Sequence, residues 1–196
     1  MKNIVNTSKY LYTLINNYTP FNEQEKKDKA VMLEFVNSFD DVLTRNNHLG
    51  HFSASTLVVN EDFTKTLLVH HNVYNGYVLP GGHADGEDDF LSVAIREVKE
   101  ETGIEVKPYS NEIFSIFSAP VAGHIKRGEF IPAHIHYDVL YLLVAKNEDM
   151  KKIRKLESEN SDVIWRDLDQ CMGEDMVYFI RPQMEKLITQ IKEIKK

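Results

Sequence analysis

Residues 79–106 read LPGGHADGEDDFLSVAIREVKEETGIEV, and the rest of the chain is organised around this stretch. Pro80-Gly81-Gly82 predicts a tight loop, because proline fixes φ and glycine permits positive φ or a close approach of the backbone to a ligand. An amphipathic helix should follow and end at Gly103, before a strand-like alternation from Ile104 to Val106. The apolar positions at helical spacing predict a buried stripe formed by Leu91, Ala94, Ile95, Val98 and Thr102.

The same helix carries three closely spaced glutamates. Glu97, Glu100 and Glu101 are three and four residues apart, which predicts that they share one helix face. Carboxylates at this spacing repel one another by up to roughly 0.5 kcal/mol per pair. A divalent cation would turn this repulsion into attraction, and Mg²⁺ and Mn²⁺ favour oxygen ligands. The alternative is a solvated acidic face, as on many helices, but the glycines on both sides favour a metal site.

The pattern closely resembles the signature of the Nudix hydrolases, Gx5Ex7REUxEExGU, in which U is a bulky aliphatic residue. The matching positions are Gly82-x5-Asp88-x7-Arg96-Glu97-Val98-x-Glu100-Glu101-x-Gly103-Ile104. Asp88 departs from the pattern by one methylene, and the neighbouring Glu87 is an alternative for its role. Because the motif is long and rigidly spaced, a chance match is far rarer than for a short glycine motif.

This resemblance implies an α/β fold, namely a Nudix-like α/β/α sandwich with a mixed β-sheet in which the loop and helix form a metal platform. It implies hydrolysis, with Mg²⁺ or Mn²⁺, of a phosphoanhydride bond in a nucleoside diphosphate linked to X. Glu97, Glu100 and Glu101 are then the expected metal ligands, with the backbone carbonyl of Gly81 as a further one. Arg96 is expected to form a salt bridge that fixes a glutamate side chain.

The catalytic base is less well defined by the resemblance. Glu97 or Glu101 is a candidate for orienting the attacking water, although in Nudix enzymes this base often comes from a loop outside the signature.

The remaining elements are predicted from their hydrophobic patterns. Residues 1–48 should form a helical N-terminal extension, with Asn22 and Glu25 as a capping box and an apolar stripe from Met32 to Leu43. Residues 49–196 should form the Nudix hydrolase domain. The extension either packs on the domain as a helical hairpin, or makes a homodimer contact, or closes over the substrate as a lid.

Strands and a closing helix are expected after residue 50, which independently predicts an α/β layered domain. Arg181-Pro182 should mark either a kink in the closing helix or its true first turn. The expected strands are Ser53–Val59, Thr66–His71, Tyr77–Leu79, Glu112–Ala119, Ile135–Ala145 and Asp162–Trp165, and the closing helix is Met176–Ile194.

Histidines form a second notable group. His134, His136 and Asp138 alternate at the start of the expected central strand, so their side chains should point to one face. One interpretation is that this face borders the metal site, where His136 and Asp138 contact the substrate or the metal and His83 contacts the substrate. A second is a separate transition-metal site, because imidazole is the commonest ligand of such metals. The plainest alternative is a hydrogen bond between His136 and Asp138 in a half-buried position.

Two further residues are candidates for substrate contacts. Tyr74, in the turn before the glycine loop, is the better candidate for stacking on a nucleobase, whereas Trp165 is expected to pack in the core. Arg127 lies beside Lys126 between two glycines, where a basic loop could meet a substrate phosphate. A solvated turn is the alternative for both basic residues.

Composition limits the class of protein. The net charge of −7 argues against general binding of nucleic acid or of anionic membranes. The longest apolar run, Val139 to Ala145, is too short to span a bilayer. The single cysteine, Cys171, excludes an intrachain disulfide framework and suits a reducing compartment. We therefore expect a cytoplasmic protein, and the Nudix resemblance implies a small nucleotide-type substrate.

Two other functions stay open at this stage. A non-catalytic Nudix module that senses a nucleotide would use the same fold, but such modules usually lose the signature glutamates that this chain retains. An isoprenoid diphosphate isomerase-like enzyme also uses a related fold, and it would need Cys171 as a reactive thiol in the pocket.

Overall fold

The computed structural model describes residues 4–126, 128–155 and 160–196, and Arg127 therefore lies outside the described residues. The α-helices are α1 (Ile4–Asn17), α2 (Glu23–Ser38), α3 (Phe90–Thr102) and α4 (Arg181–Ile194), and the 3₁₀ helices are η1 (Asn147–Lys152) and η2 (Leu168–Gln170). The strands are β1 (Gly50–Asn60), β2 (Lys65–His71), β3 (Gly76–Val78), β4 (Gly81–His83), β5 (Val106–Pro108), β6 (Ser115–Val121), β7 (His124–Lys126), β8 (Glu129–Ile131), β9 (His134–Ala145) and β10 (Asn160–Asp167).

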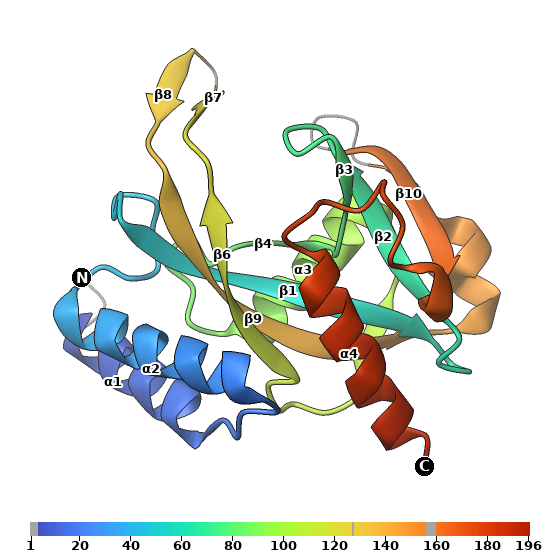
Figure 1. Cartoon of the computed structure of the whole chain (residues 1–196), viewed down its shortest axis with the longest axis horizontal. Coiled ribbons are helices and arrows are strands. Elements are labelled where there is room, and N and C mark those ends of the chain that lie inside the picture. Colours follow the sequence, from blue (N-terminus) through green and yellow to red (C-terminus); the bar gives the residue numbers. More distant parts are fainter. Residues whose placement is uncertain (1–3, 127, 156–159) are drawn as a thin grey trace.

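A mixed sheet forms the centre of the molecule. Its main path runs β10-β2-β1-β9-β5, while β3 pairs with β2, β4 with β1, and β6 with β9. The β1–β9 pair is parallel over its whole length, and the other pairs are antiparallel. Helix α4 crosses in front of the sheet in Figure 1, and α3 lies behind it. The predicted α/β/α arrangement with a mixed sheet is therefore confirmed.

The glycine pair forms a strand, so the prediction of a glycine loop at Gly81-Gly82 was wrong. Strand β4 pairs with β1, and Gly81 lies opposite Ser55. A Cβ atom at residue 81 would lie 2.6 Å from the carbonyl oxygen of Ala54, so only glycine allows this close pairing. The turn comes later instead, at Asp85 and Gly86, which both have positive φ.

Helix α3 ends as expected. The side chain of Asp89 accepts a hydrogen bond from the backbone N–H of Ser92, and Gly103 ends the helix with φ 72°. Its buried stripe was only partly predicted, because Leu91 and Ile95 are partly exposed. The buried residues of α3 are Phe90, Val93, Ala94, Val98, Glu101 and Thr102.

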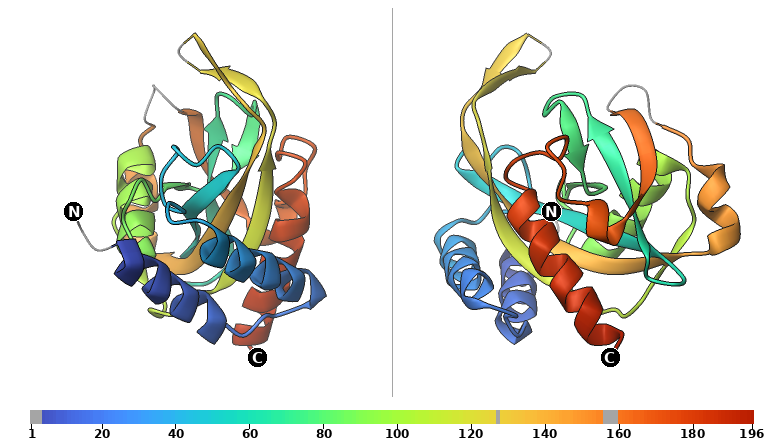
Figure 2. Two further views of the ribbon diagram at one scale, coloured as in Figure 1. Left: turned by 90° about the vertical axis from the view of Figure 1, so that its left-hand side faces the viewer. Right: turned by 45° about the vertical axis from the view of Figure 1, so that its right-hand side comes forward.

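Helices α1 and α2 lie side by side, as both views of Figure 2 show, and α2 packs against β6. Asn22 caps α2 as predicted, but the capping box is incomplete, because the Glu25 carboxylate accepts from the N–H of Phe21. The helix also ends at Ser38, earlier than the apolar stripe suggested. Val42 and Leu43 are nevertheless buried, because the chain after the helix continues along the core.

A buried ion pair connects the N-terminal helices to α4. Lys186 Nζ lies 2.8 Å from Glu25 Oε1, and Ser115 also donates a hydrogen bond to that oxygen. Burial alone would raise the pKa of Glu25, but the hydrogen bonds from Lys186 and Tyr18 lower it instead. The pair fixes α2 and α4 against β6, because separating the two charges in the interior is strongly unfavourable.

The closing helix is shorter than expected. Helix α4 starts at Arg181, with Pro182 in its first turn, and residues 176–180 precede it in an irregular segment that bridges to Tyr77. Trp165 packs against the core, as predicted. In the part of the chain that the structure describes, no helix is both long enough and apolar enough to cross a membrane.

Candidate metal centre

The three signature glutamates of α3 lie at three different depths. Glu101 is 3% exposed, the side chain of Glu97 is 19% exposed, and that of Glu100 is 57% exposed. The shared helix face therefore runs from the core to the solvent. Such an edge suits a site that must hold a cation and admit a charged substrate from solution.

Glu101 ties the helix to the glycine strand. One of its carboxylate oxygens accepts a hydrogen bond from the backbone N–H of Gly81 at 3.0 Å. The other accepts from the side-chain amide of Asn160 at 3.1 Å. Each carboxylate oxygen has a second lone pair, so Glu101 can hold β4 and β10 and still face a cation. Asn160 was missed by the sequence analysis, because it lies 59 residues away at the start of β10.

Glu97 lies directly against Gly82. A Cβ atom at residue 82 would lie 2.6 Å from each carboxylate oxygen of Glu97. Any side chain there would push the carboxylate away, so glycine is required by the position of the acid. The two glycines of β4 thus contact Glu101 and Glu97 in turn.

Arg96 lies among the acids, as the signature predicted. Its guanidinium donates to Glu87 at 2.7 Å and lies 3.9 Å from Glu97 and 4.0 Å from Glu100. Because the group is partly exposed, these contacts orient side chains more than they stabilise the fold. Within the signature region, Glu87 and not Asp88 accepts the hydrogen bond from Arg96.

The donor set fits Mg²⁺ or Mn²⁺. Three carboxylates and a closely approached glycine backbone supply oxygen atoms, which these hard cations prefer. The positive charge of Arg96 partly balances the acids in the absence of a cation.

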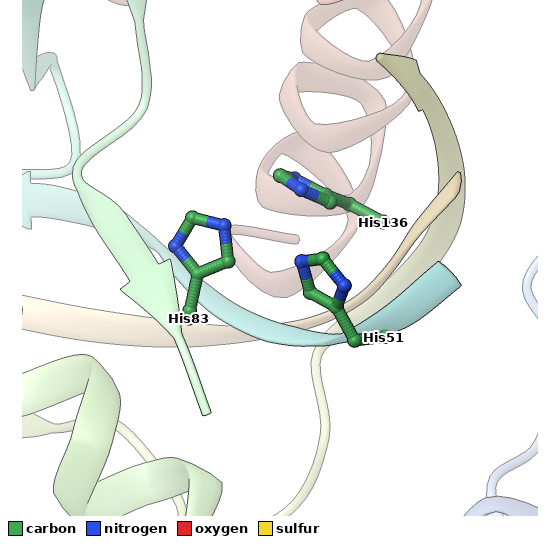
Figure 3. Close-up of side chains that lie close together, drawn as sticks. All are labelled: His51, His83 and His136. Carbon is green, nitrogen blue, oxygen red and sulfur yellow. The ribbon is translucent and has the colours of Figure 1, made fainter. Parts of the chain in front are cut away.

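A histidine cluster lies on β1, β4 and β9. His51 of β1, His83 of β4 and His136 of β9 bring one ring nitrogen each within 4.8 Å of the others. Figure 3 shows the three rings gathered around one space, each from a different strand. His134 adds a contact, because its Nε2 lies 3.0 Å from Nε2 of His136.

The cluster is electrically neutral at ordinary pH. Burial lowers the pKa of His51 to about 4, of His83 to about 3 and of His136 to about 2. The charge of Arg45 and the neighbouring rings lower these pKa values further, because each disfavours a proton on the next ring, whereas the backbone of Asn47 raises the pKa of His51.

His51 was missed by the sequence analysis. The parallel pairing of β1 and β9 places it level with His136, and the pairing of β1 with β4 places Ser53 level with His83. Both pairings join segments that lie far apart in the sequence. The sequence around His51 therefore offered only one indication of a site, a polar residue at the start of an apolar strand.

Asp138 is fully buried beside the histidines but does not bond to His136, which corrects that alternative. Ser53 donates to it at 2.7 Å, and Ser55 donates to its other oxygen. Burial raises the pKa of Asp138 to about 6, although the hydrogen bonds from the two serines oppose the shift. The predicted alternation of His134, His136 and Asp138 towards one face is what the strand shows.

The remaining candidates are not members of either group, although Lys126 is close enough to His83 for its charge to lower the pKa of that ring. The ring of Tyr74 packs edge-on against Phe179 and 4.7 Å from the ring of His71. Lys126 lies in β7, on the hairpin that projects from the body in Figure 2. Cys171 is buried, its thiol donates to the carbonyl of Asp167, and burial raises its pKa to about 12.

Comparisons with known proteins address the family directly. Residues 50–188 match the model of the NUDIX domain. The m7GpppN-mRNA hydrolase NUDT17 of Xenopus laevis is 30% identical over 99 residues, which are 48% of this chain and 32% of that protein. A "Probable DHNTP pyrophosphohydrolase" of Lactococcus lactis subsp. cremoris (strain MG1363) is 29% identical over 126 residues, which are 64% of this chain and 72% of that one. The chain thus spans about a third of the Xenopus relative.

Solved structures share the fold at low identity. A NUDIX-family hydrolase from Clostridium perfringens aligns with a TM-score of 0.52 at 18% identity, covering 74% of this chain and 97% of that one. A UDP-X diphosphatase aligns with a TM-score of 0.52 at 16% identity, covering 98% of this chain and 97% of that one. The second match therefore extends over the N-terminal helices as well.

Proposed function

The chain belongs to the NUDIX domain family, as its signature predicted, and from this premise we propose that α3 and β4 form the site of a divalent-metal-dependent pyrophosphohydrolase. The proposed substrate is a nucleoside diphosphate linked to X, cleaved at a phosphoanhydride bond. Both curated relatives carry the names of hydrolases, which supports hydrolase activity.

One observation carries the proposal: two acids of the signature contact two consecutive glycines of one strand. Glu101 accepts from Gly81, and Glu97 occupies the space that a side chain at Gly82 would need. We infer that Glu97, Glu100, Glu101 and the carbonyl of Gly81 hold Mg²⁺ or Mn²⁺. When bound, the cation neutralises phosphate charge and lowers the pKa of bound water.

The residues of the chain then have distinct tasks. Arg96 keeps Glu97 and Glu100 oriented, and its bond to Glu87 holds the guanidinium in turn. Glu101 fixes the glycine strand, since it is buried and bonded to Gly81. Glu97 is the better candidate for orienting the attacking water, because it is partly exposed.

Further substrate contacts are proposed from the sequence pattern. Tyr74 is proposed to stack on the base and Arg127 to meet a phosphate. His83, His136 and Asp138 lie on β4 and β9. The acidic charge and the single buried thiol support a cytoplasmic location for an enzyme of small nucleotide-type substrates. A homodimer through the N-terminal helices remains a proposal.

The isomerase alternative loses support from the position of Cys171. A catalytic thiol should be accessible and have a lowered pKa, whereas Cys171 is buried and its pKa is raised to about 12. The retained glutamates of α3 favour an enzyme over a nucleotide sensor.

The test is product release from a panel of nucleotides, nucleotide sugars, dinucleoside polyphosphates and ADP-ribose, with Mg²⁺, with Mn²⁺ or with EDTA. We expect EDTA-sensitive turnover of one class. Glu100→Ala should abolish it, whereas Glu105→Ala should not, because Glu105 lies beyond the end of α3 and pairs with Lys99.

Each other outcome has a defined meaning. Full activity of Glu100→Ala would remove Glu100 from the ligand set. A folded protein that binds Mn²⁺ but turns over no member of the panel would contradict the hydrolase proposal and support the sensor.

A further inference from the structure

We propose that His51, His83 and His136 form a transition-metal site, best suited to Zn²⁺, that is separate from the carboxylate site of the proposed hydrolase. The three imidazoles come from β1, β4 and β9, so the site joins three strands of the sheet. An all-nitrogen set is typical of Zn²⁺ and its neighbours in the transition series and is poorly suited to Mg²⁺.

The geometry is close to that of a bound site. The three donor nitrogens lie within 4.8 Å of one another. Two nitrogens that each lie about 2.0–2.1 Å from a tetrahedral zinc ion are roughly 3.4 Å apart. Side-chain rotations of about an ångström would therefore close the cluster around a cation, while the strands that carry the rings keep their pairing.

An independent observation points to a missing ligand. His51 is 3% exposed, and neither of its ring nitrogens has a hydrogen-bond partner of good geometry in the described part of the chain. A buried polar group without a partner is unfavourable by a few kcal/mol, roughly 1–3 in protein interiors. A cation in the cluster would give a ring nitrogen of His51 a partner. No side chain in the described part of the chain provides one.

Hydrogen bonds at His134 prepare His136 to bind a metal. His134 Nδ1 lies 2.8 Å from the carbonyl oxygen of Pro132, which can only accept, so Nδ1 carries the proton. In the neutral ring, Nε2 of His134 is then the acceptor for Nε2–H of His136, 3.0 Å away. This assignment leaves Nδ1 of His136 with a free lone pair for a cation.

His134 is therefore a positioning residue rather than a ligand. Three imidazole ligands leave one position open, as in catalytic zinc sites, where water or a substrate takes the fourth place.

The site is distinct from the carboxylates because neighbouring residues of a strand point to opposite faces. Gly82 faces Glu97 of α3, whereas His83 faces His51 and His136. Asp138, on the histidine side of β9, is close enough to Lys186 of α4 for that charge to affect its pKa, which places the histidines on the α4 side.

The experiment uses the full chain stripped of metal by EDTA and then freed of EDTA. Zn²⁺ is titrated by calorimetry, and Co²⁺ is used as a spectroscopic probe, because its visible bands report nitrogen ligation in a tetrahedral site. We expect about one tightly bound Zn²⁺ per chain. His83→Ala and His51→Gln should each weaken binding by more than the roughly 10- to 100-fold that loss of an outer-shell partner causes, and His134→Ala should fall within that range.

The controls separate this site from the carboxylates and from other histidines. His124→Ala, in the projecting hairpin, should bind Zn²⁺ as the unmodified chain does, and so should Glu97→Gln. Far-UV circular dichroism checks folding, and His83→Ala carries the test if the buried His51→Gln does not fold. Zn²⁺ binding that survives in His83→Ala, or that is lost in Glu97→Gln, would overturn the proposal whether or not the hydrolase proposal holds.

Discussion

The two faces of strand β4 differ in chemistry although they belong to consecutive residues. Gly82 makes room for the Glu97 carboxylate on α3, and the next residue, His83, joins the imidazoles of His51 and His136. One side offers oxygen donors at the edge of the solvent, and the other offers nitrogen donors in a more buried place. The comparison teaches that alternation along one short strand separates oxygen donors from nitrogen donors, so the two proposed sites would hold cations of different hardness.

The largest expected effect on turnover comes from changing a carboxylate of α3. Glu97→Gln should lower metal-dependent turnover by about 10²- to 10³-fold, the range typical of losing one electrostatic contact to a transition state. The glutamine keeps the size of the side chain, so the fold should persist. Steady-state kinetics measure the loss of turnover. An equal loss in Glu105→Gln would show that turnover depends on the overall negative charge of this region and not on Glu97.

A buried carboxyl on the histidine side should make stability depend on pH. The pKa of Asp138 is raised to about 6 in the folded protein, above the value of about 3.9 in an unfolded chain. The folded state therefore holds this proton more tightly, and its contribution to stability is present below pH 4 and is lost as pH rises through 6. The shift corresponds to about 3 kcal/mol between those limits.

Asp138→Asn removes this titration and keeps acceptor and donor atoms for Ser53 and Ser55. Urea unfolding at pH 4 and at pH 8 should show the variant gaining stability relative to the unmodified chain as pH rises. The difference between the two proteins cancels the contributions of other groups. A constant difference in unfolding free energy between the two proteins across this pH range would contradict a raised pKa of Asp138.

A smaller change should come from the glycine itself. Gly82→Ala places a methyl group against the Glu97 carboxylate, the flexible end of its side chain. We expect turnover to fall about tenfold and the free energy of unfolding to fall by about 1 kcal/mol, at the low end of overpacking. Kinetics and urea unfolding measure both quantities. Gly128→Ala, at φ 88° with nothing within 4 Å of the added Cβ, should lower stability through backbone strain and leave turnover unchanged. A larger effect on stability than on turnover would show that Gly82 serves packing alone.

The smallest effect should be seen at Cys171, which lies away from both faces. Its burial and its pKa of about 12 predict almost no alkylation by iodoacetamide in the folded protein at pH 8 and rapid alkylation in urea. Mass spectrometry of the modified chain measures the rate. Rapid modification of the folded protein would reopen a catalytic role for this thiol.

The arrangement of the glutamates on α3 could be predicted from the sequence because these residues are close together in the chain. Asp89 caps α3, Gly103 ends it, and the acids lie within one helix, so spacing alone places them. The pairing of β4 with β1 overrode the turn preference of Gly81 and Gly82, because the close approach to Ala54 requires glycine in a strand as much as in a turn.

The cluster of His51, His83 and His136 could not be predicted from the sequence in the same way. His136 and Asp138 were placed on one face by alternation, but His51 joins them only through the parallel register of β1 and β9. Asn160 reaches Glu101 from β10, also through a long-range pairing. Such registers depend on the packing of the whole sheet, so a pattern in one segment carries little trace of them.

Competition between cations tests the separation of the two faces most directly. The measurement is the affinity for Zn²⁺ in buffer alone and with saturating Mg²⁺ or Mn²⁺. If the histidines and the carboxylates form separate sites, the affinity of the tight site should be the same in all conditions. An affinity that falls in proportion to the concentration of Mg²⁺ or Mn²⁺ would show that the cations share one site and would contradict this account.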